Sequence, residues 1–374
     1  MWLATRRCRS GHLWCFAQRL EGPCRFVGPA HRWIESMKLG LDIGGTKTAA
    51  AILRADGSVA ALHTAPSGHG PAEVIAVAAM LAKAALAQVS AELALTPDDS
   101  HTLPQRAGAC MPGLVDPLTG RVRHAVNLGV SSMDLRAGLS EALGLEVSIE
   151  NDVKAAALGA DQLMRARAAA ARLAAVRSGS TAGGSLATAR ITAHKPEHQI
   201  LAYLNVGTGL AAAVVRDGQV VRGRDGIVGE IGHLPVAGGA PCKCGQFGCL
   251  ETIASGSALD RLWNVPAGRG RDPFAAAAAG DQRAAHAARV LCHGIALSLQ
   301  LLVLTTGAER IVLGGGLCAL GKALENGIRS ELTRDASTSD FVAALELADR
   351  FELLPSDVPV AALGAALLPS VAQL

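Results

Sequence analysis

The chain carries the same pattern of apolar and polar residues twice, at residues 39–63 and at residues 201–221. In each copy an apolar run of strand length meets a glycine turn, a second apolar run follows, and an Asp-Gly pair leads into a third. Apolar runs between turn residues predict strands, and Asp-Gly predicts a hairpin. The repeat predicts two related α/β halves with a cleft between them. The predicted strands are residues 39–43, 48–53, 59–63, 201–206, 210–216 and 220–221.

Helical periodicity, with apolar residues three and four positions apart, fills much of the remaining chain. We therefore expect an α/β fold with an N-terminal domain at residues 37–150 and a C-terminal domain at residues 151–374. Residues 178–195 are rich in Ser, Thr and Gly and have no period, which indicates a mobile surface insertion. The predicted helices are residues 71–95, 135–143, 153–175, 284–306 and 363–368.

Residues 1–36 differ in composition from everything that follows. They hold six Arg against two Glu, which leaves a net charge of −1 for the rest of a chain whose total is +3. They show no hydrophobic period, whereas a strand pattern begins directly after Met37. We expect Met37 to be the true start and this leader to be disordered or wrongly assigned to the protein. A targeting segment is the alternative, but its apolar run is short and interrupted by polar residues.

Composition excludes several classes of protein. The nearly neutral charge outside the leader argues against a nucleic-acid partner. No apolar run approaches the roughly 20 residues that a membrane-spanning helix requires. The nine Cys do not suggest a disulfide framework, because three lie in one loop while Cys110, Cys292 and Cys318 are scattered singly in apolar segments. We therefore expect a protein of the reducing cytoplasm, without membrane partners.

One glycine-rich loop, residues 230–251, gathers four soft metal ligands within 17 residues. One imidazole and three thiolates are a preferred ligand set for a tetrahedral structural Zn²⁺. Buried cysteines are common in any core, but this density in one loop favours the metal. A closed structural site does no chemistry, so we expect it to hold neighbouring polar side chains rigidly. The predicted ligands are His233, Cys242, Cys244 and Cys249, and the polar side chains so held are Glu230, Glu251 and His233 itself.

The glycine turns of the repeat suit phosphate groups. Glycine lets backbone N–H groups approach phosphate oxygens, and Thr or Lys adds a hydroxyl or a cation. The spacing is not that of a Walker loop, and a single such turn is usually only a hairpin. Two turns at matching positions favour a nucleotide cleft, with Asp42 holding Mg²⁺ through water and a third glycine turn offering bare backbone to a purine base. The predicted ATP-binding residues are Asp42, Gly44, Gly45, Thr46, Lys47, Gly207, Thr208, Gly209, Gly314, Gly315 and Gly316.

A predicted strand at residues 147–151 ends in Glu150-Asn151-Asp152, directly before a predicted helix. One interpretation is that Asp152 only caps the helix. The other is catalytic, because a carboxylate at the carboxyl end of a strand, open to the cleft, can accept a proton from a substrate hydroxyl. Phosphoryl transfer needs little beyond positioning, charge neutralisation and such a base.

Taken together, these segments resemble the ROK family of sugar kinases and sugar-responsive repressors over residues 37–370. The resemblance implies an actin-like, duplicated ATPase fold of the ribonuclease H-like type, usually assembled as a homodimer or homotetramer. It implies that ATP phosphorylates a hexose hydroxyl. The matching segments are LDIGGTKTAAAIL, MPGLVDPLTGRV, VSIENDVKAAALG, NVGTGLAAAVV, GEIGHLPV with CKCGQFGCLE, and IVLGGG.

The same resemblance implies roles for particular residues. Asp152 would be the base that acts on the sugar 6-hydroxyl. His233 would bind zinc through one ring nitrogen and the sugar through the other. The residues implied to hold the sugar ring hydroxyls are Asn151, Glu230, His233 and Glu251.

The chain also departs from the family pattern. Asn205 stands where a Thr is usual, and Lys154 stands where a small or amide side chain is commoner. The Trp that usually follows the NL segment is missing, because residues 127–130 continue with Ser131 and Ser132. An aromatic wall near the sugar is therefore absent. The segment at residues 164–198 is longer than the family usually has.

Two classes of function follow from this resemblance. Family repressors carry an N-terminal winged-helix domain, and 36 aperiodic residues are too few for one. Because Asp152 and both phosphate turns are present, a kinase is also favoured over a sugar sensor without catalysis. Glucose is the first expected substrate, with N-acetylglucosamine and N-acetylmannosamine as alternatives.

Overall fold

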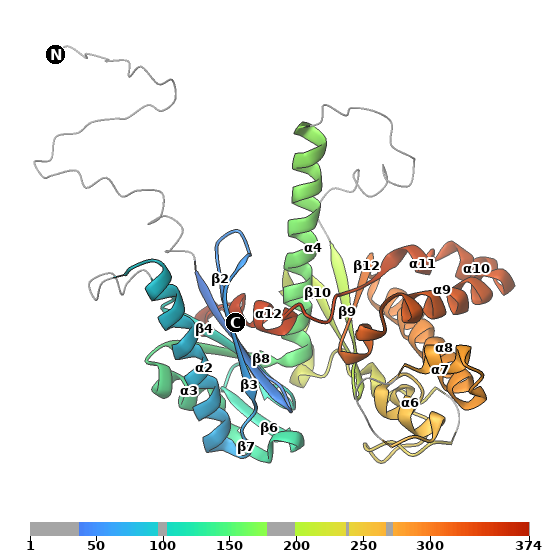
Figure 1. Ribbon diagram of the computed structural model, residues 1–374, viewed down its shortest axis with the longest axis horizontal. Coiled ribbons are helices and arrows are strands. Elements are labelled where there is room, and N and C mark those ends of the chain that lie inside the picture. The colour runs from blue at the N-terminus through green and yellow to red at the C-terminus, as the bar shows by residue number, and fades with distance from the viewer. Residues whose placement is uncertain (1–36, 96–102, 178–198, 237–238, 267–271, 374) are drawn as a thin grey trace, which may run out of the picture.

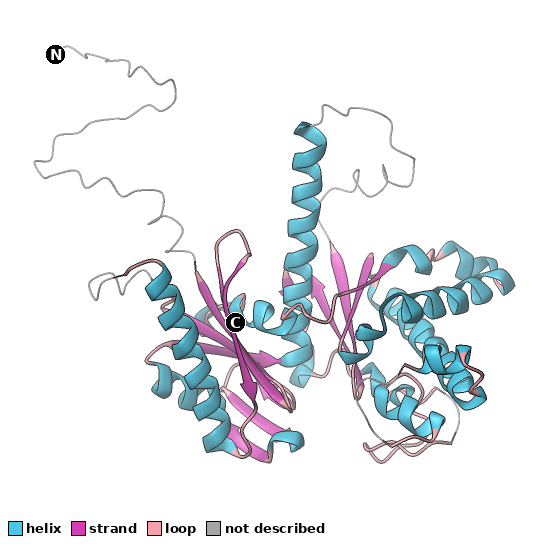
Figure 2. Ribbon diagram, viewed as in Figure 1, coloured by secondary structure: helices cyan, strands magenta, loops and turns pink. Residues whose placement is uncertain are grey.

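The computed structural model of the protein describes residues 37–95, 103–177, 199–236, 239–266 and 272–373. Figure 1 shows two α/β lobes on either side of a long central helix, and Figure 2 shows that each lobe is built on its own sheet. The predicted leader at residues 1–36 and the predicted insertion at residues 178–195 lie outside the described residues.

The two main sheets have the same topology. The first has the order β3-β2-β1-β4-β8 and the second β11-β10-β9-β12-β13. In each, the first three strands along the chain form an antiparallel meander, and the fourth and fifth run parallel to the first. The predicted duplication is thereby confirmed. The strands are β1 Lys38–Ile43, β2 Lys47–Leu53, β3 Val59–Pro66, β4 Arg106–Met111, β8 Glu146–Asn151, β9 Ile200–Val206, β10 Leu210–Arg216, β11 Gln219–Val220, β12 Arg310–Gly314 and β13 Phe351–Leu353.

Helices cover the outer face of each sheet. Alternate residues of β1, Leu39, Leu41 and Ile43, pack in one core with α2, because successive side chains of a strand point to opposite faces. In the second lobe, alternate residues of β9 pack in the same way with α8. The covering helices are α2 Pro71–Glu92 and α3 Leu135–Leu143 in the first lobe, and α6 Gly256–Trp263, α7 Pro273–Ala278, α8 Gln282–Thr306, α9 Gly321–Thr338, α10 Asp340–Ala344 and α11 Leu347–Arg350 in the second.

A third, antiparallel sheet lies at the edge of the first lobe. It has the order β5-β6-β7 and consists of β5 Leu114–Asp116, β6 Arg121–Ala125 and β7 Val130–Asp134. The sequence pattern did not predict it, because these strands are short and half exposed and so lack an uninterrupted apolar run.

Two helices correct the expectation that no segment resembles a membrane span. By length and composition alone, α2 and α8 are apolar enough to cross a membrane, with mean hydropathies of 1.8 and 1.7. Alanine contributes much of this hydropathy in α2, whereas leucine contributes most of it in α8. In the structure, buried residues of both helices belong to the two lobe cores.

The central helix α4 Asp152–Arg177 crosses a short C-terminal helix, α12 Val360–Ala366. The sequence predicted α4 within two residues at each end, whereas α12 begins three residues before its prediction and ends two residues earlier. Each of the two helices packs on the sheet of the other lobe. In chain order α4 comes directly after the last strand of the first sheet, but it packs on β9 and β10. Likewise, α12 comes after the last strand of the second sheet, but it packs on β1 and β4. The predicted domain division after residue 150 is not tested by this packing and stays a prediction.

The crossing is a backbone-to-backbone contact. A Cβ on Gly364 would overlap the carbonyl oxygen of Ala155, and a Cβ on Gly159 would overlap that of Val360. The same close approach continues onto the first sheet, where Gly40 and Gly108 lie against the backbone of α12. Only glycine allows helices and strands to meet this closely.

Replacing Gly364 by Ala should therefore destabilise the protein strongly. The added methyl group overlaps fixed backbone rather than a flexible side chain, so we expect a loss of about 3 kcal/mol or a failure to fold. Denaturant unfolding measures the effect. Gly239→Ala is the matched control, because nothing lies within 4 Å of its added Cβ, and it should unfold like wild type. Equal stabilities for the two variants would contradict the account of the crossing.

Candidate active site

The predicted phosphate turns connect the first two strands of each lobe. In the first turn, Gly44 N–H donates to the Lys47 carbonyl at 3.0 Å, and the Ser67 hydroxyl donates to the Gly44 carbonyl at 2.6 Å. Lys47 itself is exposed. Ser67, which sequence reasoning missed, fixes this turn from the loop that follows β3.

The second turn is fixed by the metal-ligand loop. Gly207 N–H donates to the Gly209 carbonyl at 3.0 Å, and the Glu251 carboxylate accepts the Leu210 N–H at 2.9 Å. A Cβ on Gly209 would come within 2.5 Å of that carboxylate. Glu251, predicted as a sugar ligand, therefore also links residues 230–251 to the second glycine turn.

The third glycine turn lies beside the second. Gly315 has a φ of 94°, and a Cβ there would come within 2.6 Å of the Val206 carbonyl and 2.8 Å of the Asn205 side-chain oxygen. Gly314 lies against the ring of Tyr203 in the same way. The carboxyl ends of β9 and β12 therefore pack so closely that the turn after β12 has no room for a Cβ atom.

Asp42, on β1, is the first of two carboxylates predicted to act in the site. On β1 it points away from the core that its neighbours Leu41 and Ile43 enter. The Cys110 thiol lies 3.7 Å from its carboxylate. Burial, together with the nearby charge of Asp152, raises the pKa of Asp42 to about 7.

Asp152 is the first residue of α4, but the side chain that caps this helix belongs to Asn151. The Asn151 side-chain oxygen accepts the N–H groups of Val153 at 3.0 Å and Lys154 at 3.2 Å, which is the hydrogen-bond pattern of an N-cap. The Asp152 carboxylate accepts the Val153 N–H, also at 3.0 Å, but not that of Lys154. Burial and the nearby carboxylate of Glu230 raise the pKa of Asp152.

A buried ion pair joins the two lobes beside Asp152. The Arg222 Nε, just after β11, donates to the Glu150 carboxylate on β8 at 2.7 Å, and the Glu150 side chain is 2% exposed. The other Glu150 oxygen accepts the Asn151 N–H at 3.0 Å. Sequence reasoning missed Arg222, because no local pattern shows that it meets a residue 72 positions away.

The four predicted metal ligands come together. The His233 Nδ1 lies 3.6 Å from the Cys242 sulfur, and the sulfurs of Cys244 and Cys249 are 3.6 Å apart. All four ligand atoms lie within 4.8 Å of one another. Bonds of about 2.0–2.3 Å to a tetrahedral Zn²⁺ imply ligand separations of about 3.5–3.8 Å. The donor set therefore fits zinc, with the His233 Nε2 outside the ligand set.

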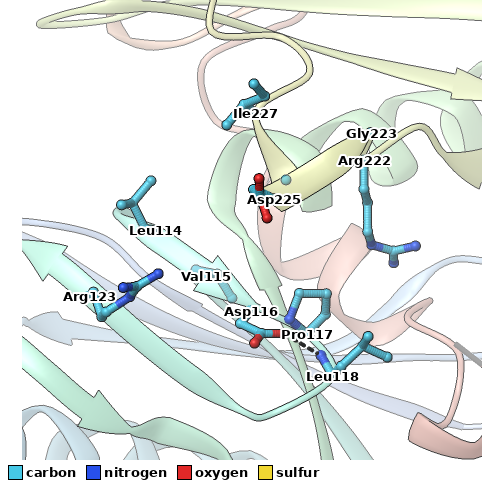
Figure 3. A pocket seen from close by; sticks show the side chains of 11 residues that line it. Leu114, Val115, Asp116, Pro117, Leu118, Arg123, Arg222, Gly223, Asp225 and Ile227 are labelled. Carbon is cyan, nitrogen blue, oxygen red and sulfur yellow. Dashed lines mark hydrogen bonds between the residues drawn. The ribbon is translucent and has the colours of Figure 1, made fainter.

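A cavity of about 470 Å³ lies between the third sheet and the segment after β11 (Figure 3). It shares Arg222 with the ion pair described above, and none of the predicted site residues lines it. Its lining residues are Leu114, Val115, Asp116, Pro117, Leu118, Arg123, Arg222, Gly223, Asp225, Gly226 and Ile227.

The ROK family matches residues 38–190 and 181–366. Glucokinase from Halalkalibacterium halodurans is 29% identical over 236 residues, covering 58% of this chain and 63% of that protein, so the match spans less than two thirds of its length. Glucokinase from Thermotoga maritima is 25% identical over 330 residues, covering 83% of this chain and 90% of that protein.

Regulators and solved structures also match. The DNA-binding transcriptional dual regulator NagC of Escherichia coli is 27% identical over 239 residues, covering 60% of this chain and 52% of that protein. The structure of a ROK hexokinase from Thermus thermophilus superposes with a TM-score of 0.64 at 27% identity, covering 88% of this chain and 97% of that one. The chain therefore has the duplicated actin-like ATPase fold that its sequence predicted.

The ligand geometry predicts one Zn²⁺ per chain, measurable by elemental analysis. Cys244→Ser should lower the zinc content and the melting temperature together, because the loop loses an anchor. Cys318→Ser, which replaces a buried Cys outside the loop, should keep full zinc. A folded, active wild-type sample without stoichiometric zinc would contradict this prediction.

Asp42 should cost stability at neutral pH. Its folded pKa of about 7 exceeds the ordinary 3.8, so the unfolded state loses its proton first and stability falls as pH rises between these values. Asp42→Asn should therefore unfold at higher denaturant than wild type at pH 8, by on the order of 3 kcal/mol, and the difference should vanish near pH 4.

The control for this measurement is Asp116→Asn. Hydrogen bonds from Thr119 lower the pKa of Asp116, so this substitution should reduce stability at pH 8. If Asp42→Asn also reduces stability at pH 8, the conclusion that burial raises the pKa of Asp42 is wrong.

Proposed function

Because this chain belongs to the ROK family, we propose that it is a sugar kinase that transfers the γ-phosphoryl group of ATP to a hydroxyl of a hexose, glucose first. The glucokinases among its relatives support this choice of substrate. So does the resemblance of a ROK family glucokinase from Streptomyces griseus, solved in complex with glucose and AMPPNP, at a TM-score of 0.61 and 24% identity.

The observation that carries the proposal is the pairing of Asp42 and Asp152. Two carboxylates lie at the carboxyl ends of parallel strands of one sheet, and each has a raised pKa. Buried carboxylates with raised pKa values occur mainly at functional sites. Glu230 approaches Asp152 from the second lobe, so both lobes contribute to one site.

In the proposed reaction Asp152 accepts the proton of the sugar hydroxyl as its oxygen attacks the γ-phosphorus of ATP. A new oxygen–phosphorus bond forms, and the bond to the bridging oxygen breaks with its electron pair leaving on ADP. The backbone N–H groups of the two glycine turns and the side chains of Thr46, Lys47 and Thr208 hold the phosphates. Mg²⁺, which Asp42 would hold through water, neutralises phosphate charge when bound.

The sugar lies, in this proposal, against Asn151, Glu230, His233 and Glu251. Their other contacts support rigid positions: the Asn151 oxygen is engaged by the α4 cap, and one Glu251 oxygen is engaged by Leu210. Zinc bound at the His233 Nδ1 would fix the imidazole and leave the Nε2 for a ring hydroxyl.

An N-acetylglucosamine or N-acetylmannosamine kinase is the alternative within the same chemistry, and a sugar-responsive regulator is the alternative of another class. The similarity to NagC supports the second alternative. We place the kinase first because a regulator needs no proton acceptor. Asn151 caps α4, so capping does not explain the presence of Asp152, whereas a role as proton acceptor does. We further propose a cytoplasmic homodimer or homotetramer.

A coupled assay of ADP release across hexoses and N-acetylhexosamines, with zinc-replete protein and Mg²⁺, tests the proposal. We expect ADP formation that depends on a sugar and is fastest with glucose. Sugar binding by calorimetry without ADP release from any sugar would favour the regulator instead.

Asp152→Asn should keep sugar and ATP binding but lower kcat by about 10² to 10⁴, the usual contribution of a positioned base. Its melting temperature should not fall below that of wild type, because Asn151 caps the helix in both proteins and the raised pKa of Asp152 means that a neutral Asn does not lose stability at neutral pH. Asp134→Asn, the same change at the N-cap of α3, is the control and should leave kcat unchanged. Near wild-type kcat in Asp152→Asn would require another base.

A further inference from the structure

Arg222 connects the two lobes through its side chain. It follows β11, an edge strand of the second sheet, and reaches Glu150 on β8, an edge strand of the first sheet. The Arg222 Nε lies 2.7 Å from a Glu150 oxygen, and the Glu150 side chain is 2% exposed. Removing one partner of so buried a pair leaves an uncompensated charge, so each side chain holds the other in place.

In the first lobe, this ion pair holds the backbone that carries Asn151. The Glu150 oxygen that is not bound to Arg222 accepts the Asn151 N–H at 3.0 Å. The Asn151 side chain is fixed as well, because its oxygen caps α4 and its amide nitrogen donates to the Gly113 carbonyl at 3.4 Å. Arg222 is therefore two hydrogen bonds away from a residue that we propose to bind the sugar.

In the second lobe, the backbone of Arg222 begins the loop that leads to Glu230. The Val228 N–H donates to the Arg222 carbonyl at 3.3 Å, and the Glu230 N–H donates to the Ile227 carbonyl at 3.2 Å. Arg222 thus belongs to the same hydrogen-bonded loop as the carboxylate that we propose to bind the sugar from this lobe.

Lys154 is a second cation near Glu150, but it does not make the same connection. Burial lowers the pKa of Lys154, and the nearby charge of Glu150 opposes this shift. Lys154 lies in the first turn of α4, on the same chain segment as Glu150. Within the part of the chain that the structure describes, the ion pair that joins Glu150 to the second lobe is the one with Arg222.

We infer that Arg222 is a positioning residue for sugar binding, acting through its ion pair with Glu150. The pair fixes Asn151 of the first lobe at a set separation from Glu230 of the second. Arg222 itself lines the cavity shown in Figure 3, which none of the proposed sugar residues lines, so it acts through its neighbours and not on the sugar. The inference rests on the proposed function for the identity of the sugar residues.

The test uses the sugar that wild type binds most tightly by calorimetry among glucose, N-acetylglucosamine and N-acetylmannosamine. Arg222→Met should raise the Kd and KM for this sugar about tenfold or more, while KM for ATP stays within about twofold, because only the sugar contacts are displaced. A purely structural role would lower the melting temperature but leave the sugar Kd of the folded protein unchanged. An unchanged sugar Kd in folded Arg222→Met would overturn the inference.

Arg224→Met is the matched control, at an arginine of the same loop. Its ion pair with Asp225 joins side chains that are 93% and 77% exposed, and such a pair contributes little. This variant should bind the sugar as wild type does. A rise in Kd equal to that of Arg222→Met would overturn the inference, because it would show that any loss of charge in this loop weakens binding.

A double-mutant cycle tests whether Arg222 acts through Glu150. In Glu150→Gln the side-chain oxygen can still accept the Asn151 N–H, and no carboxylate is left unpaired when Arg222 is also replaced. The double variant should therefore bind the sugar more tightly than Arg222→Met, and within about threefold of Glu150→Gln alone. Losses that multiply in the double variant would overturn the inference.

The same cycle decides if Arg222→Met does not fold, because neither Glu150→Gln nor the double variant contains the unpaired carboxylate. In that case a Kd about tenfold higher in the double variant than in Glu150→Gln would overturn the inference. Wild-type protein that binds a sugar but releases no ADP would overturn the proposed kinase and leave this role of Arg222 standing. Wild-type protein that binds none of the three sugars would overturn both.

Discussion

The glycine contact between α4 and α12 is the constraint on which the arrangement of the two lobes depends. Each helix carries the sequence Ala-Ala-Leu-Gly-Ala, at residues 156–160 and 361–365, and each glycine lies against the backbone of the other helix. The contact is therefore reciprocal, as expected where duplicated halves meet around a pseudo-twofold axis. Because α4 begins at Asp152 and packs on the second sheet, the same contact fixes the candidate base relative to both lobes.

Duplication explains the scaffold, and departures from it explain the chemistry. Asp42 and Asn205 hold equivalent positions, two residues before the glycine turn of each half, so only the first half carries an acid there. Gly40, which admits the backbone of α12, is matched by Tyr203, whose ring fills the corresponding face of the second sheet. The second half instead adds the metal-ligand loop, and Glu251 ties that loop to the second phosphate turn. Each half thus contributes a different set of groups to one site.

Local patterns predicted what local forces determine. The meander strands and α3 and α4 were found because their apolar period is regular, and the metal ligands because they lie within one loop. The third sheet, the strands β4 and β13 and the helices α6, α7, α9, α10 and α11 were not predicted. The short elements among them are stabilised by tertiary packing rather than by periodicity. The ion pair between Arg222 and Glu150, the capping role of Asn151 and the burial of Lys154 depend on how distant segments meet. The repeated Ala-Ala-Leu-Gly-Ala was a visible signal that could have predicted the crossing of α4 and α12.

The central claim is that the phosphoryl group reaches the sugar rather than water. ³¹P NMR of the zinc-replete protein with Mg²⁺, ATP and glucose follows that group directly. The account predicts that the γ-phosphate resonance of ATP is replaced by that of a hexose phosphate ester, in equal amount to the ADP formed. ATP that persists, or that yields only inorganic phosphate, would contradict it.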